Sequence, residues 1–171
     1  VRTMSARRFS TYPTRITDVG VLFDLTIHDV DLLCYLADSP VLSVYATGRK
    51  VINENFEDHI NLSLNFKNGV IGLCETSWLV PNRTRDLSII SSRYHSKIDY
   101  LAQTIELFSS IETEKISVKA EESLLHELND FLTSILQNSP PLVTGLDGLN
   151  AVKIVEAGLE SLSKESIVKL E

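Results

Sequence analysis

Apolar and polar positions alternate in several short segments of the chain, and a period of two is typical of a half-buried strand. Residues 60–66, "INLSLNF", show this alternation clearly, and "VIGLCETSW" follows them after the dipeptide Asn68-Gly69. Asn-Gly supplies the positive φ values that a type I′ turn requires. The two segments are therefore predicted to form a β-hairpin.

The register of this hairpin decides which side chains face the core. We expect Lys67 to pair with Val70 across the turn. Leu64 then lies opposite Leu73 on the core side of the sheet. The other side carries small and mixed residues, namely Ser63, Asn65, Gly72 and Cys74.

The rest of the pattern predicts further strands and three helices. One helix is expected to begin at an N-cap, Asp18, and to end near Ala37, before Ser39-Pro40. The other expected elements are strands at Arg2 to Phe9, Val41 to Ile52, Asp86 to Ser91, Ser96 to Leu101 and Thr104 to Phe108, and helices at Ser123 to Gln137 and Leu146 to Leu162. This order predicts an α+β fold with a largely antiparallel sheet that helices cover on one face.

Composition limits the class of protein. A chain of 171 residues with 43% hydrophobic residues is expected to form a single domain, 1–171. Its net charge of -7 argues against nucleic acid or an anionic membrane as a partner, because both are held mainly by clustered Lys and Arg. Cys34 and Cys74 lie in apolar contexts without zinc-ligand spacing, so we expect reduced cysteines, no metal and a cytoplasmic location.

The helix predicted over residues 18–37 carries ionisable side chains on one narrow face. At ~100° per residue, His28 and Asp31 both fall within about 40° of Asp24. The rest of the circumference is apolar and is interrupted only by Asp29. A helix that is apolar on nearly all sides is buried, so we expect this polar stripe to face a cleft.

Three interpretations of the stripe are open from spacing alone. Asp24 and His28, four residues apart, could be a local stabilising pair. Asp24, His28 and Asp31 could bind a metal, since their residue types permit it. The third interpretation is a general base, because a neutral imidazole can accept a proton near neutral pH while a carboxylate orients it.

Three segments resemble a known family. "RITDVGVLFDLTIHDVDLLCYL" resembles the opening of the C-terminal domain of the Gfo/Idh/MocA family of NAD(P)-dependent sugar and cyclitol oxidoreductases, with its Gly-(x)n-Asp-x-x-x-His-x-x-Asp pattern. "FKNGVIGLCETSWLVPNRTRDLSII" and "LHELNDFLTSILQNSPPLVTGLDGLNAVKIVEAGLESL" resemble the family's central hairpin and closing helices. The resemblance covers almost the whole chain and implies the family's glyceraldehyde-3-phosphate dehydrogenase-like C-terminal fold.

The resemblance also implies roles for single residues. His28 would be the catalytic base that takes a hydroxyl proton while hydride leaves the same carbon for the nicotinamide of NAD or NADP. Asp24 would orient His28 or bind the neighbouring hydroxyl, and Asp31 would bind substrate or support the helix. The segments look most like members acting on nucleotide-linked sugars, such as UDP-N-acetylglucosamine 3-dehydrogenase. The cations expected near a substrate diphosphate are Arg15, Arg83 and Arg85, although each could instead be surface charge.

One departure from the family is large. Family members bear an N-terminal Rossmann domain that binds the dinucleotide and supplies a lysine, and this sequence contains no Gly-x-Gly-x-x-Gly motif. We therefore expect the substrate-side domain of such an enzyme, inactive by itself and assembled as a homodimer or homotetramer through the sheet face with Ser63, Gly72 and Cys74. The alternative is a non-catalytic oligomerisation module, in which the polar stripe would be plugged by the chain's own residues.

Overall fold

The computed structural model describes residues 1–118 and 121–170. Its elements in chain order are β1 (Thr3–Phe9), a π-helix η1 (Leu22–Thr26), α1 (Ile27–Ala37), β2 (Val41–Arg49), β3 (His59–Phe66), β4 (Ile71–Ser77), β5 (Thr84–Ile90), β6 (His95–Asp99), β7 (Thr104–Phe108), β8 (Thr113–Ser117), α2 (Ser123–Gln137), α3 (Gly145–Lys164) and β9 (Val168–Lys169). Within these residues the strands form one nine-stranded sheet in the order β8-β7-β6-β5-β1-β4-β3-β2-β9.

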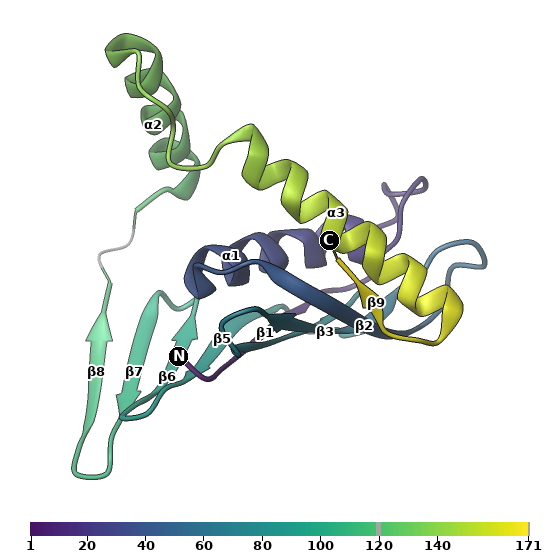
Figure 1. Ribbon diagram of the computed structural model, residues 1–171, viewed down its shortest axis with the longest axis horizontal. Helices are drawn as coiled ribbons and strands as arrows, with labels where there is room; N and C mark the ends of the chain where they lie inside the picture. Colours follow the sequence, from purple (N-terminus) through teal and green to yellow (C-terminus); the bar gives the residue numbers. More distant parts are fainter. Residues whose placement is uncertain (119–120, 171) are drawn as a thin grey trace.

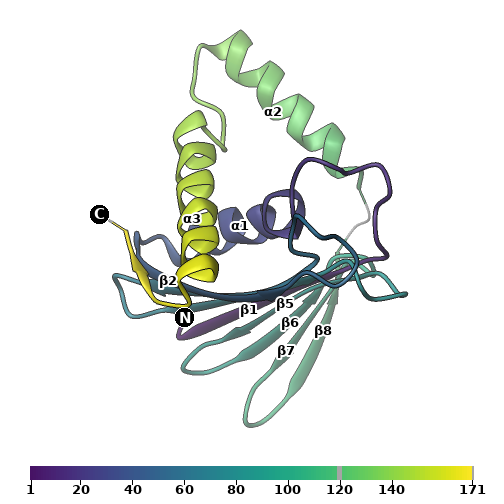
Figure 2. The same ribbon diagram turned by 90° about the vertical axis from the view of Figure 1, so that its right-hand side faces the viewer.

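The molecule has a layer of helices on one side of the sheet (Figures 1 and 2). Helices α1 and α3 cover that side, and the opposite side is open. Strand β1 pairs in parallel with β4, and the other strand pairs are antiparallel. The expected α+β fold, with a largely antiparallel sheet covered on one face, is confirmed.

Alternating burial along the strands produces the core. On β1, Met4 and Ala6 are buried beneath the helices, and on β3 Leu62 and Leu64 are buried in the same layer. Leu33 of α1 packs into this layer from above. The period-two pattern in the sequence therefore has its physical origin in a sheet with one covered face.

The register of the β3–β4 hairpin differs from the predicted one. Leu64 pairs with Gly72, so it does not face Leu73. Only Gly69 of the turn has a positive φ, at 84°, and Phe66 N–H donates to the Val70 carbonyl oxygen across a three-residue loop. A single left-handed glycine after a type I turn adds one residue to a hairpin loop compared with type I′.

The additional loop residue turns β4 over relative to the prediction, so that its other set of side chains faces the helices. Gly72 and Cys74 are buried on the helix side, whereas Ile71 and Leu73 are exposed on the open side. Ser63 does lie on the open side, opposite Leu73. The face predicted to carry Ser63, Gly72 and Cys74 together does not exist.

The element boundaries agree with the prediction in some places and differ in others. Helix α2 and strand β7 begin and end where the sequence predicts them. The predicted strand from Val41 to Ile52 already ends at Arg49, and the edge strands β8 and β9 were not predicted. Asp18 does not cap the first helix, because η1 begins at Leu22 and its N-cap is Val21.

Helix α2 stands away from the sheet (Figure 1). Every one of its residues is exposed except the half-buried Ser134. Its large apolar side chains are 50% to 85% exposed, namely Leu124, Leu125, Leu128, Phe131, Leu132, Ile135 and Leu136. An isolated helix of this length is marginally stable in water, so this apolar surface needs a partner.

Candidate active site

The polar stripe lies where the π-helix η1 passes into α1. Ile27 N–H donates to the carbonyl oxygen of Leu22, five residues back, which is the hydrogen bond of a π turn. Asp24 lies within this wider turn, and His28 lies in the regular helix that follows. Short π segments occur often at functional sites, because they change the direction of neighbouring side chains.

Glu57 holds the start of this helix in place. Its carbonyl oxygen accepts from Val21 N–H at 2.9 Å, and its Oε1 accepts from Leu22 N–H at 3.0 Å. Together they satisfy two amides that the first turn of a helix leaves free. A methyl group at Gly20 would overlap the Glu57 carboxylate, so a larger residue there would displace that carboxylate from the start of the helix.

Asp29 fixes the helix to the sheet below. Arg8 of β1 donates from Nε to Asp29 Oδ2 at 3.0 Å and from Nη2 to Asp29 Oδ1 at 2.6 Å. The two side chains are 14% and 2% exposed. This bidentate ion pair explains why Asp29 interrupts the otherwise apolar surface of the helix.

The three residues of the predicted stripe are differently placed. His28 is exposed, while Asp24 and Asp31 are half-buried. Burial raises the pKa of Asp31, and the charge of nearby Asp147 raises it further, whereas His28 acts in the opposite direction. Asp31 and His28 are therefore close enough to interact electrostatically. Asp24 and His28 share no hydrogen bond in the described part of the chain.

A pocket of about 1020 Å³ opens beside the stripe, between α1 and α3. Asp31 and Tyr35 line it from α1, and Asp147 lines it from α3. Asp31 is the one member of the stripe among the residues that line this pocket, and His28 and Asp24 lie outside its lining. The imidazole of His28 is exposed to solvent.

The three predicted arginines do not form one group. Arg15 lies exposed in the loop between β1 and η1. Arg85 of β5 lies opposite Arg8 of β1. Burial lowers the pKa of Arg85, and the charges of Arg8 and Arg83 lower it further, so Arg83 also lies close to Arg85. The structure thus brings two of the three together, near the Arg8–Asp29 pair.

Sequence reasoning missed two residues of this region and the partner of a third. Glu57 gave no signal, and neither did Tyr100, whose pKa is affected by the charges of Asp29 and Arg8, because both residues are distant from the helix in the sequence. Asp29 did give one, as the polar residue on an otherwise apolar surface, but its partner could not be read from the pattern. Among the described residues no three His, Cys, Asp or Glu side chains gather as metal ligands. In the same part of the chain, every helix is too short or too polar to cross a bilayer.

Comparison with known proteins gives relatives of one kind. Over 165 residues the chain is 27% identical to myo-inositol 2-dehydrogenase of Thermotoga maritima, covering 89% of this chain and 49% of that protein. It is 24% identical over 157 residues to UDP-N-acetylglucosamine 3-dehydrogenase of Acidithiobacillus ferrooxidans, covering 86% of this chain and 50% of that protein. The chain therefore spans about half the length of these curated relatives.

Solved structures have the same fold. The structure of the Acidithiobacillus ferrooxidans dehydrogenase superposes with a TM-score of 0.90 at 23% identity, over 95% of this chain and 54% of that one. Levoglucosan dehydrogenase in complex with NADH and L-sorbose superposes with a TM-score of 0.86 at 17% identity, over 99% and 58%. A family model described as the GFO/IDH/MocA C-terminal domain matches residues 3–94, which include β1, the π turn, α1 and the central hairpin. The chain belongs to the GFO/IDH/MocA family of oxidoreductases, as its C-terminal domain.

Proposed function

We propose that this chain is the substrate-binding half of an NAD(P)-dependent oxidoreductase that oxidises a hydroxyl group of a sugar or a nucleotide-linked sugar. The observation that carries the proposal is the exposed imidazole of His28 at the start of α1, with Asp24 in the preceding π turn and Asp31 in α1 itself. The relatives support the reaction class, since the names of two of them specify dehydrogenases for a cyclitol and a nucleotide sugar.

In this proposal His28 is the general base. An unprotonated ring nitrogen of His28 accepts the proton of the substrate hydroxyl as hydride leaves the same carbon. Asp31 stabilises the resulting imidazolium, consistent with its interaction with His28. Asp24 orients the imidazole or binds a neighbouring hydroxyl. Arg15, Arg83 and Arg85 are the cations available to an anionic part of the substrate.

The nicotinamide cofactor supplies the hydride acceptor when it is bound. This chain has no glycine-rich helix start that could offer backbone amides to its pyrophosphate. The residues present therefore do not fit the dinucleotide, and we assign its binding to a separate Rossmann domain. His28 and its carboxylates complete the site from the substrate side.

The apolar surface of α2 supports the existence of such a second domain. Seven large apolar side chains of α2 are exposed, and Leu142 and Leu146 beyond it are 68% and 76% exposed. A contiguous apolar surface of this kind is typical of an interface. Because the chain spans about half of its relatives, we assign this surface to contact with the dinucleotide-binding domain.

The test compares the 171-residue chain with a protein that joins it to its dinucleotide-binding domain. We expect the joined protein to bind NADH and to reduce NAD+ or NADP+ with a sugar or nucleotide-linked sugar, and the chain alone to do neither. Calorimetry measures NADH binding, and nicotinamide absorbance measures turnover. Micromolar NADH binding by the chain alone would refute the division of labour, and an inactive joined protein that binds NADH would refute the reaction. In the same pair of proteins, hydrogen exchange at the α2 amides should slow only in the joined form.

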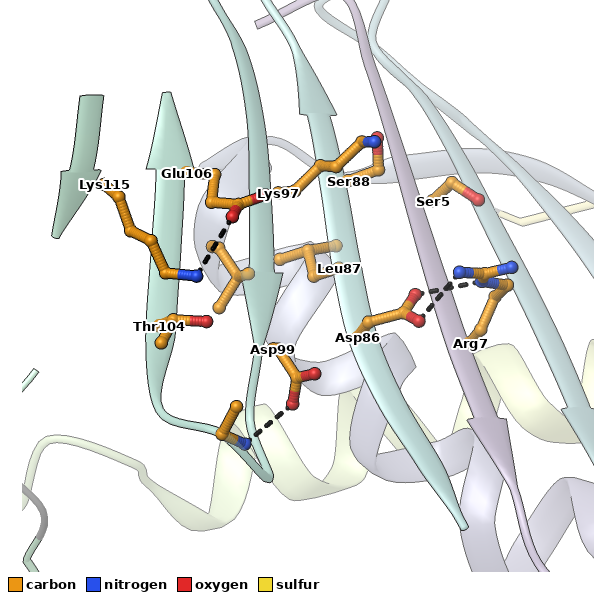
Figure 3. A pocket seen from close by; sticks show the side chains of 12 residues that line it. Ser5, Arg7, Asp86, Leu87, Ser88, Lys97, Asp99, Thr104, Glu106 and Lys115 are labelled. Atoms are coloured by element: carbon orange, nitrogen blue, oxygen red, sulfur yellow. Dashed lines mark hydrogen bonds and ion pairs between the residues drawn. The ribbon is translucent and has the colours of Figure 1, made fainter. Parts of the chain in front are cut away.

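We propose that two copies of the chain associate through the β2–β4 half of the open sheet face. That half presents Tyr45 of β2 and Ile71 and Leu73 of β4 at 40% to 42% exposure, on either side of Ser63 and Asn65 of β3. The other half, from β1 to β8 across the sheet, is unsuited because it is charged. Arg7 of β1 points to Asp86 of β5, and Lys115 of β8 points to Glu106 of β7 (Figure 3).

In sedimentation experiments the chain is expected to be a dimer or tetramer, and Leu73→Lys should shift the equilibrium towards the monomer. The same change at Leu101, an exposed leucine beyond β6, is the control. A wild-type monomer at high concentration would contradict this assignment.

A further inference from the structure

A row of polar side chains crosses the covered face of the sheet beneath α1. Arg8 of β1 lies opposite Thr76 of β4 on one side and opposite Arg85 of β5 on the other. Tyr100 extends the row, since its N–H donates to the Arg85 carbonyl oxygen at 3.0 Å. Residues directly opposite on neighbouring strands point to the same face. The bond from Arg8 to Asp29 shows that this face is the one under the helix.

Three polar atoms of this row are buried without a hydrogen-bond partner among the described residues. They are Arg85 Nε, Tyr100 Oη and Thr76 Oγ1. Nearly all buried polar groups in proteins are hydrogen-bonded, so three exceptions in one row need an explanation. Arg85 Nε–H and the Tyr100 hydroxyl can each donate a bond. The two atoms themselves are enclosed, but Arg85 and Tyr100 are only half-buried, so an acceptor that enters beside these side chains can accept from both donors.

The charge of the row points to the kind of acceptor. Asp29 is committed to Arg8, and neither Arg83 nor Arg85 forms an ion pair within residues 1–118 and 121–170. The arginine charges act on one another, because Arg8 and Arg83 lower the pKa of Arg85 in addition to its burial. Repulsion of this kind within a chain of net charge -7 is relieved by an anion.

Tyr100 remains a donor at neutral pH. Burial raises the pKa of its hydroxyl to about 12, and the charge of Asp29 contributes in the same direction. The hydroxyl therefore stays protonated and suits an oxyanion. A planar guanidinium with its Nε–H free is suited to phosphoryl oxygens.

We propose that Arg85 and Tyr100, with Arg83 beside them, bind a phosphoryl group of the substrate, so that the substrate is a phosphorylated or nucleotide-linked sugar and not a neutral one. The inference rests on the proposed function, because Asp29 directly follows His28 and places the row beneath the turn that carries the base. It also separates two classes that the relatives leave open, a cyclitol and a nucleotide sugar.

The test is calorimetry on the 171-residue chain with three ligands: UDP-N-acetylglucosamine, glucose 1-phosphate and neutral N-acetylglucosamine. We expect the two phosphorylated ligands to bind and the neutral sugar to bind at least ~10-fold more weakly. Loss of one charge-assisted hydrogen bond lowers affinity by about that factor. Tighter binding of the nucleotide sugar would identify a nucleotide-linked substrate. Equal binding of the two would identify a sugar phosphate.

Two variants connect this binding to the row. Arg85→Gln should weaken both phosphorylated ligands by ~10-fold or more, and Tyr100→Phe by a smaller factor. Arg93→Gln, which removes an exposed arginine from the turn between β5 and β6, is the matched control and should change nothing. Tyr100→Phe should also leave the melting temperature unchanged or raise it, because the hydroxyl has no partner in the ligand-free chain. If the hydroxyl instead formed a stabilising hydrogen bond within the chain, Tyr100→Phe would lower the melting temperature.

Two outcomes would overturn the inference. One is equal binding of neutral and phosphorylated sugars, and the other is phosphate binding that survives both variants. Neither outcome bears on hydride transfer, which is measured separately in the joined protein. A joined protein that oxidises neutral sugars, with Arg85→Gln fully active, would retain the proposed function and reject this substrate class.

Discussion

Replacing His28 with Ala is expected to lower kcat by a factor of about 10² to 10⁴ in a protein that carries this chain together with its dinucleotide-binding domain, since that is the usual contribution of a positioned general base. Loss of hydride builds positive charge on the carbinol carbon, so the hydroxyl proton has to leave in the same step. The affinity for NADH should change much less, because the cofactor is held by the other domain. Steady-state kinetics and NADH titration measure the two effects.

The pH profile separates a catalytic role of this helix from a structural one. Removing a carboxylate near His28 withdraws a negative charge that favours the imidazolium, so the acidic limb of kcat/KM should move to lower pH in Asp31→Asn. Asp24→Asn should give an intermediate loss of kcat through poorer orientation of the ring.

His59→Ala is the control for this series, because His59 lies at the start of β3 beside Asn61, on the open side of the sheet. A folded His28→Ala enzyme whose kcat stays within about twofold of the parent would end the assignment, since a general base contributes far more than that.

Asp29→Ala is expected to lower the free energy of unfolding by about 3–5 kcal/mol, because it leaves the Arg8 guanidinium buried without its counter-charge. A loss of this size is a large share of the stability of a typical domain. Urea unfolding of the parent and the variant measures it. The double substitution Arg8→Met with Asp29→Leu should restore much of the loss, because it removes both charges at once.

The neighbouring residue on the same strand supplies the control. Arg7 forms an equally short pair with Asp86, with bonds of 2.9 and 2.8 Å, but Arg7 is 52% exposed on the open face. Water and salt screen such a pair, so Asp86→Ala should cost only about 0–1 kcal/mol. Similar losses from Asp29→Ala and Asp86→Ala would show that burial does not control the strength of these pairs.

The sequence by itself determined the local features of the chain. The bounds of α2, Ser123–Gln137, follow from a helical period of apolar residues that ends before Ser139-Pro140, and no distant contact is needed to produce them. The covered antiparallel sheet was predicted from the order of strands and helices along the chain, which is also read directly from the sequence. The stripe of Asp24, His28 and Asp31 also followed from spacing along one helix, and its match to a family pattern identified the family.

The tertiary structure decided the features that spacing along the chain does not specify. The left-handed Gly69 after a type I turn shifted the hairpin by one residue and exchanged its faces, although Asn-Gly alone favoured the other turn. The π turn at Asp24 departs from the regular helical period, and it begins where Glu57 satisfies the first amides.

The buried ion pair and the polar row belong to this second group. Arg8 and Asp29 are 21 residues apart, and Arg85 and Tyr100 join them only because β1, β5 and β6 are neighbours in the sheet. A charge pattern in the sequence does not specify which strand lies beside which, since strand order is set by packing of the whole chain. The polar interruption at Asp29 could be recognised from the sequence, but its partner and the unsatisfied donors beside it required the fold.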